Sequence, residues 1–482
     1  MCYTFFMKNS KNTTESAFFS KEKSLLPLFS SIFATITFCL YAPVQIYFGN
    51  AEEFLFTLYD FWFIPVGVFI TVTLILFLIG NNLHGKAKTI FCAILFAAGL
   101  LIYLQGSILF ENMGVLNGMP YALTDHLSHA IPNTAIWVLA AAIIVLLALK
   151  VKASRKTLTS LSIAGSAFIL ISLILILAGA KSEYLRPRDS FISDKNILNA
   201  SKEKNVIVIV PDMFDKTYME AILDETPEIS YELEGFTFYD GLEGCFDSTK
   251  DSLSYFLNTD PLFSPLDTYG YSFGIYTDSR FIPDSLKESC DNIISGESGI
   301  NNIPKFIATL YRLVGCSYAP DILRQACWLM GDEFDSLYSP KDSDEALYTI
   351  SNTAFYEKLE SFGINESHSP RFELIHLYGA HYPYITDENL NPMIPSYSDA
   401  NAIRASRGTL KIIFEYLNKL KKAGAYDNSL IVIMADHGYT EPGAINDPLL
   451  MIKPADSTGD FKTAKAYINQ ADIPEIITDN LP

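Results

Sequence analysis

The sequence has too little positive charge for a protein that binds nucleic acid. It holds 35 Lys and Arg against 54 Asp and Glu in 482 residues, a formal net charge of −19. A surface of this sign repels a phosphate backbone, so we expect no nucleic-acid partner. The acidity suits a domain that works among divalent cations, although solubility explains it equally well. The sequence also lacks internal repeats and low-complexity tracts, which gives no reason to expect a repeat architecture.

The cysteines are few and lack the spacing of a zinc-binding motif. Of the seven, Cys39 and Cys92 lie in apolar runs, where cysteine behaves as a small hydrophobic residue. Four more lie in the polar part of the chain and allow three pairings, and a disulfide among them is consistent with an oxidising compartment. Their spacings disfavour metal binding by these cysteines. The four are Cys245, Cys290, Cys316 and Cys327.

Long apolar runs dominate the first 181 residues, whereas the remainder alternates polar and apolar segments. Charge follows the same division, because residues 1–181 hold 11 Lys and Arg and 7 Asp and Glu, and the remainder holds 24 and 47. Five runs approach the ~20 residues that a transmembrane helix needs. A cleaved signal peptide is a poor alternative, since a long polar-rich stretch precedes the first run and four more runs follow. The predicted spans are 26–48, 57–79, 89–110, 134–150 and 160–180.

The loops between these spans alternate in charge, and this alternation predicts their orientation. Lys and Arg are enriched in short cytoplasmic loops. The N-terminal tail and the second and fourth loops are basic, whereas the first and third loops have no Lys or Arg. The N-terminus is therefore predicted inside, and five spans place everything after Lys181 outside. The basic residues are Lys8, Lys11, Lys21 and Lys23 in the tail, Lys86 and Lys88 in the second loop, and Lys150, Lys152, Arg155 and Lys156 in the fourth.

The sequence thus predicts a multi-pass protein of the cell membrane with three regions. Residues 1–181 form a transmembrane domain of five helices. Residues 182–204 are polar, contain Pro187 and are expected to form a juxtamembrane linker. Residues 205–482 form an extracytoplasmic domain.

Three apolar runs in this last region predict strands buried on both faces, as in the parallel sheet of an α/β domain. They are NVIVIVPD at 205–212, FELIHL at 372–377 and SLIVIMADHG at 429–438. Ligands gather at the carboxyl ends of the strands in such sheets. Each residue found there is, by itself, better explained as a turn, a cap or a surface residue. Together they are a ligand set suited to Zn²⁺ or Mn²⁺, and they are Asp212, His381, Asp436 and His437.

Two hydroxyl side chains precede a helical pattern between the first and second strands. Ser248 and Thr249 stand just before an apolar spacing that begins at Asp251. Backbone N–H groups and the helix dipole favour an anion at such a position. A hydroxyl that also binds a metal there is activated as a nucleophile. Considered alone, the pair is better explained as an N-cap.

The order of these motifs resembles the alkaline phosphatase superfamily, and in particular its membrane-bound lipoteichoic acid synthases and phosphoethanolamine transferases. The resemblance covers 205–475, including PLLMIKP at 448–454, and five spans before an outward catalytic domain match the lipoteichoic acid synthase layout. It implies an alkaline phosphatase-like α/β domain with a mostly parallel central sheet. It also implies that Thr249 is the nucleophile and that His381 contacts the substrate. The implied ligands of one divalent metal, Mn²⁺ or Zn²⁺ or else Mg²⁺, are Asp212, Thr249, Asp436 and His437.

Departures from the family pattern narrow the implied chemistry. Lipoteichoic acid synthases usually have Glu where this chain has Asp212. Arylsulfatases carry a Cys or Ser in a C/S-x-P-x-R signature that becomes formylglycine, whereas Cys245 is followed by FDST. Ordinary sulfatase chemistry is therefore disfavoured. The histidines outside the transmembrane domain are too few for a typical two-metal site, which favours one metal, and they are His368, His376, His381 and His437.

The leading hypothesis is transfer of a phosphoglycerol-type head group from a membrane lipid to a cell-surface glycan or polyol polymer, through an intermediate on Thr249. A phosphoethanolamine transferase uses the same chemistry with another donor, and a hydrolase of phosphate or sulfate esters uses water as the acceptor. A catalytically silent protein that senses lipid or binds a partner is a fourth hypothesis, and the intact ligand set disfavours it. Segment 259–345 has no assigned counterpart and is expected to shape acceptor specificity.

Overall fold

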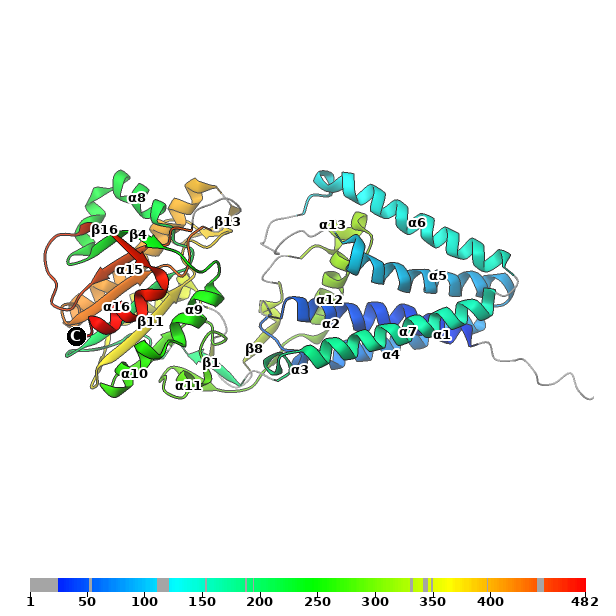
Figure 1. Cartoon of the computed structure of the whole chain (residues 1–482), viewed down its shortest axis with the longest axis horizontal. Helices are drawn as coiled ribbons and strands as arrows, with labels where there is room; N and C mark the ends of the chain where they lie inside the picture. The colour runs from blue at the N-terminus through cyan, green and yellow to red at the C-terminus, as the bar shows by residue number, and fades with distance from the viewer. Residues whose placement is uncertain are drawn as a thin grey trace, which may run out of the picture.

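The computed structural model consists of a bundle of long helices and an α/β domain beside it (Figure 1). The predicted basic tail and the loop residues 52–53 and 111–120 lie outside the described residues. The structure describes residues 25–51, 54–110, 121–151, 154–186, 189–193, 195–329, 333–340, 346–347, 350–396, 398–439 and 446–482.

Within the described ranges, five helices are long and apolar enough to cross a membrane, which confirms the five predicted spans. Few residues of the second, fourth and fifth are buried, as expected for apolar helices that face lipid. The first and third each contain a π-helical segment. The spans are Leu26–Gly49 (α1 Leu26–Thr35, η1 Ile36–Tyr41, α2 Ala42–Gly49), Leu58–Asn82 (α3 Leu58–Phe61, α4 Phe63–Asn82), Gly85–Leu109 (α5 Gly85–Leu104, η2 Gln105–Leu109), Leu123–Lys150 (η3 Leu123–His126, α6 Leu127–Lys150) and Arg155–Gly179, within α7 (Ser154–Gly179).

The fourth span begins earlier than the predicted start at residue 134. Helix α6 starts at Leu127 and contains Pro132 in its interior. A proline near the start of a helix removes one backbone hydrogen bond, and the turns that follow are intact. Apolar residues on both sides of Pro132 therefore belong to one helix.

The α/β domain is built on a seven-stranded sheet in the order β16-β4-β15-β14-β3-β11-β5. Neighbouring strands are parallel except for the two pairs that β15 makes, which confirms the mostly parallel central sheet. The three predicted strands are the adjacent and fully buried β14, β3 and β11. The strands are β3 (Asn205–Pro211), β4 (Thr237–Glu243), β5 (Ser272–Tyr276), β11 (Arg371–Leu377), β14 (Ser429–Met434), β15 (Leu450–Lys453) and β16 (Lys462–Asn469).

Helices cover both faces of this sheet, which is why its central strands consist almost entirely of apolar residues. Helix α15 packs against α8 and α14, and α10 packs against α16. One hydrophobic core joins residues of these helices to the sheet. The helices are α8 (Lys216–Glu225), α9 (Thr249–Leu257), α10 (Asp260–Thr268), α14 (Asn352–Ser361), α15 (Asp399–Ala423) and α16 (Ile473–Asp479).

Residues 182–204 contain two short strands that pair with the α/β part of the chain. Strand β1 pairs with β6 and β9, and β2 pairs with β10. The predicted boundaries of the three regions stay a prediction. The elements not yet named are η4 (Ser182–Leu185), β1 (Ser190–Ser193), β2 (Asn199–Ser201), η5 (Pro227–Leu233), α11 (Asp284–Lys287), β6 (Ile293–Ser295), β7 (Ser298–Ile300), α12 (Ile303–Tyr318), η6 (Asp321–Leu323), α13 (Arg324–Cys327), η8 (Asp335–Leu337), β8 (Tyr338–Pro340), β9 (Ala346–Leu347), β10 (Asn365–Ser367), β12 (Tyr384–Thr386), β13 (Pro392–Ser396) and η9 (Gln470–Asp472).

Segment 303–340 belongs by chain position to the α/β domain, but its described residues, 303–329 and 333–340, include several that pack against the helical bundle. Figure 1 shows α12 and α13 among the membrane helices. Phe306 and Tyr318 of α12 share a hydrophobic cluster with Tyr41 and Phe56 of the bundle region. This segment joins the two parts of the molecule.

Candidate active site

The polar residues that follow β3, β11 and β14 lie at one edge of the sheet. These strands are parallel neighbours, so their carboxyl ends meet there. Asp212 follows β3 directly, and Asp436 and His437 come two and three residues after Met434, the last residue of β14. The register pairs Leu377 with Pro211, so His381 leaves β11 at the same edge. The topology alone thus gathers residues that are far apart in the sequence.

Asp212, Asp436 and His437 form a buried group with the geometry of a metal site. Nε2 of His437 lies 3.7 Å from Oδ1 of Asp212 and 3.6 Å from Oδ2 of Asp436. One ligand atom from each residue lies within 4.8 Å of the others. The two carboxylate oxygens, Oδ1 of Asp212 and Oδ2 of Asp436, are buried and accept no hydrogen bond from the described residues. Buried charged atoms without partners are costly, so the residues present fit a bound divalent cation.

The tautomer of His437 suits a ligand. Its Nδ1 lies 2.8 Å from the carbonyl oxygen of Gly438. A carbonyl only accepts hydrogen bonds, so Nδ1 carries the proton and Nε2 presents a lone pair to the two carboxylates. Burial lowers the pKa of His437, but the charges of Asp436 and Asp212 outweigh burial and raise it. A proton and a metal ion therefore compete for Nε2.

The two carboxylates differ in their electrostatic surroundings. Burial raises the pKa of Asp212, but His381, His376 and His437 outweigh burial and hold this pKa at about 2. Burial and the charge of Asp212 raise the pKa of Asp436. Two adjacent carboxylates cannot both stay ionised at low cost unless a cation neutralises them. The charge balance and the geometry both fit a metal at this position.

Backbone groups fix the position of the two aspartates. The N–H of Met213, whose φ is 55°, donates to Oδ1 of Asp436 at 3.0 Å. Gly379 has a φ of 63°, and a Cβ at this residue would lie 2.2 Å from the carbonyl oxygen of Asp212. The N–H of Ala380 donates to that same carbonyl at 2.9 Å. The turn after β11 therefore approaches Asp212 so closely that it requires glycine.

Thr249 lies beside this group, at the start of α9. Ser248 is the N-cap, because its hydroxyl accepts a hydrogen bond from the N–H of Asp251. Thr249 is the first residue of the helix, and its Oγ1 donates to Oδ2 of Asp212 at 3.2 Å. The side chain of Thr249 is half-buried. The structure thus divides the two hydroxyls into a cap and a group that faces the candidate metal site.

His381 is half-buried on the loop after β11. Its ring lies 5.3 Å from that of Tyr378 and 5.5 Å from that of Tyr382. Its Nδ1 has no hydrogen-bond partner among the described residues. His381 directly follows Ala380, whose N–H donates to the carbonyl oxygen of Asp212, so this loop lies beside the site. A buried ring nitrogen without a partner is one that a bound group would satisfy.

His376 is a site residue that the sequence analysis did not single out. It lies inside β11, with Nε2 3.5 Å from Oδ2 of Asp212 and Nδ1 2.9 Å from Oγ1 of Thr277. The sequence feature that could have revealed His376 is a histidine near the end of a strand that is otherwise suited to full burial. His368, by contrast, is exposed and precedes β11, away from its carboxyl end.

Other polar residues support the backbone around the site. Nε2 of Gln470 donates to the carbonyl oxygen of Asp436 at 2.6 Å. Oδ1 of Asn446 accepts the N–H of Gly438 at 2.7 Å. Asp215 caps α8 by accepting the N–H of Thr217 at 2.9 Å. These roles depend on tertiary contacts that no local motif reveals.

The six described cysteines are free, so the possible disulfide among Cys245, Cys290, Cys316 and Cys327 is not present in the structure. Cys245 is exposed three residues before Ser248, and Cys290 and Cys316 are buried. Burial raises the pKa of the thiols of Cys245 and Cys290. None of these thiols belongs to the buried group of Asp212, Asp436 and His437.

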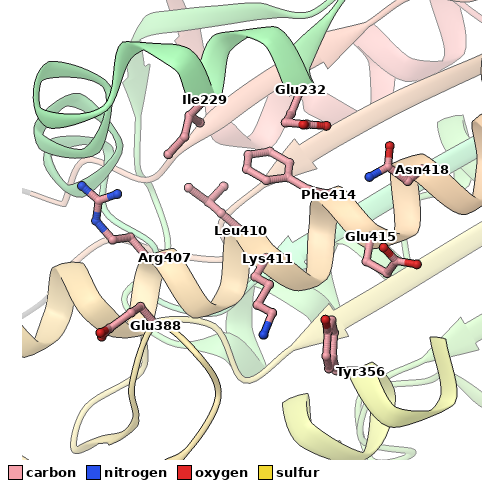
Figure 2. Close-up of a pocket in the computed structure, with 10 residues that line it drawn as sticks. All are labelled: Ile229, Glu232, Tyr356, Glu388, Arg407, Leu410, Lys411, Phe414, Glu415 and Asn418. Carbon is pink, nitrogen blue, oxygen red and sulfur yellow. The ribbon is translucent and has the colours of Figure 1, made fainter. Parts of the chain in front are cut away.

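A groove of about 410 Å³ lies elsewhere on the α/β domain, along α15. Figure 2 shows Leu410 and Phe414 of α15 facing Ile229 of η5, with charged side chains around them. None of the candidate site residues lines this groove. Its lining residues are Ile229, Glu232, Tyr356, Glu388, Arg407, Leu410, Lys411, Phe414, Glu415 and Asn418.

Comparison with known proteins gives a family match over most of the α/β domain. The family model described as Sulfatase matches residues 204–479, more than half of the chain. No curated protein matches the chain significantly.

The solved structures that the chain matches include an integral membrane protein. The integral membrane protein lipooligosaccharide phosphoethanolamine transferase A from Neisseria meningitidis is 13% identical, with 90% of this chain and 89% of that chain covered and a TM-score of 0.31. The C-terminal periplasmic domain of EptC from Escherichia coli, in complex with Zn, is 11% identical, with 60% and 85% covered and a TM-score of 0.34. The phosphonate monoester hydrolase of Agrobacterium radiobacter is 13% identical, with 57% and 73% covered and a TM-score of 0.34. At these scores the family assignment rests on the family model.

Proposed function

Because the chain belongs to the sulfatase family, we propose that it is a membrane phosphotransferase that moves a phosphoglycerol-type head group from a membrane lipid to a cell-surface glycan or polyol polymer. Family membership makes it an enzyme that acts on phosphate or sulfate esters. One observation carries the choice between them: the hydroxyl of Thr249 lies 3.2 Å from Asp212, at the start of α9. Formylglycine derives from Cys or Ser, so a threonine at this place favours phosphoryl transfer over sulfate-ester hydrolysis.

Four residues are proposed to hold one divalent metal: Asp212, Thr249, Asp436 and His437. The two unpartnered carboxylate oxygens and the lone pair on His437 support this set. A divalent cation bound there polarises the phosphoryl oxygens and lowers the pKa of the threonine hydroxyl. Carboxylate and imidazole ligands suit both Mn²⁺ and Zn²⁺.

The proposed reaction has two displacements at phosphorus. In the first, Oγ1 of Thr249 loses its proton to water and attacks the head-group phosphorus, and the bond from phosphorus to the diacylglycerol oxygen breaks. His381 protonates that leaving oxygen. In the second, an acceptor hydroxyl gives its proton to His381 and attacks the phosphothreonine, whose Oγ1–phosphorus bond breaks. Thr249 then regains a proton from water, and both protein groups return to their starting state.

The proposed location of the site is the outer side of the cell membrane. The basic loops, which are predicted to be cytoplasmic, and five spans support an α/β domain outside. An enzyme anchored in the membrane reaches a lipid donor on that side while the lipid stays in the bilayer. The proposed acceptor is on the same side, at the cell surface.

The test is a search for the covalent intermediate. The full chain in detergent micelles is incubated with phosphatidylglycerol and Mn²⁺, quenched in acid, and its intact mass is measured. We expect one phosphoglycerol adduct on Thr249, located by peptide fragmentation. Thr249→Ala should give none, whereas Ser248→Ala should keep it, because Ser248 is only the cap.

The other outcomes separate the alternatives. An adduct formed only with phosphatidylethanolamine identifies a phosphoethanolamine transferase. Turnover of a chromogenic phosphate or sulfate ester far faster than head-group transfer identifies a hydrolase. No adduct, together with unchanged surface glycans in cells that carry Thr249→Ala, contradicts the proposal.

A further inference from the structure

Helix α12 of segment 303–340 contacts the membrane helices at their π-helical segments. The hydroxyl of Tyr311 donates to the carbonyl oxygen of Cys39, within η1, at 2.9 Å. A Cβ on Gly106, within η2, would lie 2.1 Å from the ring of Tyr318, so this ring packs directly on the backbone there. π-Helical segments leave irregular backbone groups and often occur at functional sites. Both segments in this bundle are covered by the same helix.

Next to α12, a buried ion pair is bonded to the membrane helices. Asp321 and Arg324 are each only 1% exposed and lie 2.6 Å apart. Oδ1 of Asp321 accepts from Nε2 of Gln105 at 3.0 Å, and Oδ2 lies 2.6 Å from Nδ1 of His129. The N–H of Asp321 donates to Oδ1 of Asn133 at 3.1 Å. Three separate contacts thus join this turn to η2 and α6.

The depth of these contacts follows from helix geometry. Gln105 lies 17 residues after Lys88, and Asn133 lies 17 residues before Lys150. Each interval is about 26 Å at 1.5 Å per residue. Helix α5 begins and α6 ends at the end of the bundle far from the α/β domain (Figure 1). The hydrocarbon core is about 30 Å thick. Both helices therefore place the contacts of Asp321 inside this core, in the leaflet on the α/β-domain side.

Exposed apolar side chains continue from the bundle onto this segment. Ile322 and Leu323, which directly follow Asp321, are 43% and 49% exposed. Ile131, on α6 two residues before Asn133, is 59% exposed. Only 11% of the most apolar window of that span is buried, so Ile131 belongs to a face that meets lipid. Ile322 and Leu323 extend the same apolar surface.

We propose that residues 303–327 form a re-entrant element, immersed in the leaflet nearest the α/β domain, whose Ile322 and Leu323 contact phospholipid acyl chains. Non-helical backbone at such a depth is tolerated only where protein covers it. The bonds of Asp321 to Gln105 and Asn133 supply that cover, and the ion pair with Arg324 neutralises the buried charge. The element adds a second attachment of the α/β domain to the membrane, besides the chain that follows α7.

The test uses a photo-crosslinking amino acid in the full chain, reconstituted in phosphatidylglycerol–phosphatidylcholine nanodiscs. p-Benzoylphenylalanine replaces Ile322 or Leu323 in separate variants. Ile131 serves as the lipid-facing control, and Tyr231, 81% exposed on the α/β domain, serves as the aqueous control. After irradiation, phospholipid adducts are counted by mass spectrometry, and each variant is checked for an unchanged elution volume.

We expect adduct yields at Ile322 or Leu323 within about twofold of Ile131 and at least tenfold above Tyr231. Yields at both positions equal to that of Tyr231 overturn the proposal. Crosslinks to a second copy of the chain in place of lipid also overturn it, since they make the surface an oligomer contact. The readout needs no turnover, so its result is independent of whether the phosphotransferase proposal holds.

Discussion

At the scale of single residues, His376 shows how a residue inside a strand contributes to the candidate metal site. It lies between Thr277 and Asp212, with its Nε2 3.5 Å from the carboxylate. Residues around a metal ligand orient it, and their loss typically lowers metal affinity about 10–100-fold. His376 has the geometry of such a positioning residue.

We predict that His376→Leu weakens Mn²⁺ binding by about 10-fold or more, because Asp212 loses a neighbour that holds its carboxylate. Thr277→Val should have a smaller effect in the same direction, since it removes only the hydrogen bond to Nδ1. Calorimetric titration of the full chain with Mn²⁺ measures both. An unchanged affinity in His376→Leu would contradict the positioning role.

Glu373 gives a second prediction at this scale, concerning pH. It is buried in β11, 2.5 Å from Arg371, which also pairs with Asp291. One cation thus faces two carboxylates, and burial raises the pKa of Glu373 to about 8 despite Arg371. The raised pKa means that the folded protein binds this proton more tightly than the unfolded chain. This contribution to stability is complete below about pH 4.5 and is lost as the pH rises through about 8.

We therefore expect the thermal midpoint of the full chain in micelles to fall between pH 6 and pH 9, by about 1–2 °C for each kcal/mol lost. Glu373→Gln should remove this part of the decrease, because glutamine has no proton to lose. Glu366→Gln is the matched control, since Glu366 is exposed and its pair with Lys202 contributes little. Equal slopes in Glu373→Gln and the unaltered protein would refute this assignment.

At the scale of elements, the turn after β11 holds the site together. Gly379 has a φ of 63°, and its missing Cβ leaves room for the backbone of Asp212. We predict that Gly379→Ala destabilises the protein by about 1–3 kcal/mol and displaces Asp212. Gly363→Ala is the control, because nothing lies within 4 Å of a Cβ there. Thermal midpoints and Mn²⁺ titrations should both separate the two variants, and equal values would exclude the close approach.

The same scale shows what the sequence could predict. β3, β11 and β14 were predictable because strands buried on both faces are continuous apolar runs with a polar residue after them. α9 was predictable from its apolar spacing. The role of Gly379 was not, because it depends on a backbone contact with Asp212, a residue far away in the sequence. The candidate site residues were found through strand ends and family order, and their roles stay predictions.

At the scale of the whole molecule, orientation can be tested with the exposed thiol of Cys245. If the α/β domain faces outward, a membrane-impermeant maleimide should label Cys245 in intact cells without permeabilisation. Burial raises the pKa of this thiol, so labelling should be slower than for a free cysteine. Cys245→Ser is the control and should lose this label. Labelling of Cys245 that appears only after permeabilisation would place the domain inside.

Segment 303–340 was the part of the molecule that sequence patterns could not place. α12 has an apolar face, but periodicity cannot tell whether such a face covers a sheet or a membrane bundle. Phe306 and Tyr318 lie in the cluster of the membrane helices, and acceptor specificity, the role expected for 259–345, is untested. The location of such a helix depends on the elements that it packs against, and for α12 these lie hundreds of residues away in the sequence.

The docking of α12 on the bundle also has a consequence for biosynthesis. A chain made from its N-terminus inserts its spans first, and domains generally fold as they emerge. When residues 303–327 leave the ribosome, the surface that receives them is already in the membrane. β5 and β11 are neighbours in the sheet, and this docking shortens the free chain between them before β11 is made. The membrane bundle therefore provides the surface on which α12 docks while the α/β domain is completed. An α/β domain made without the bundle has to close the chain between β5 and β11 with Phe306 and Tyr318 exposed.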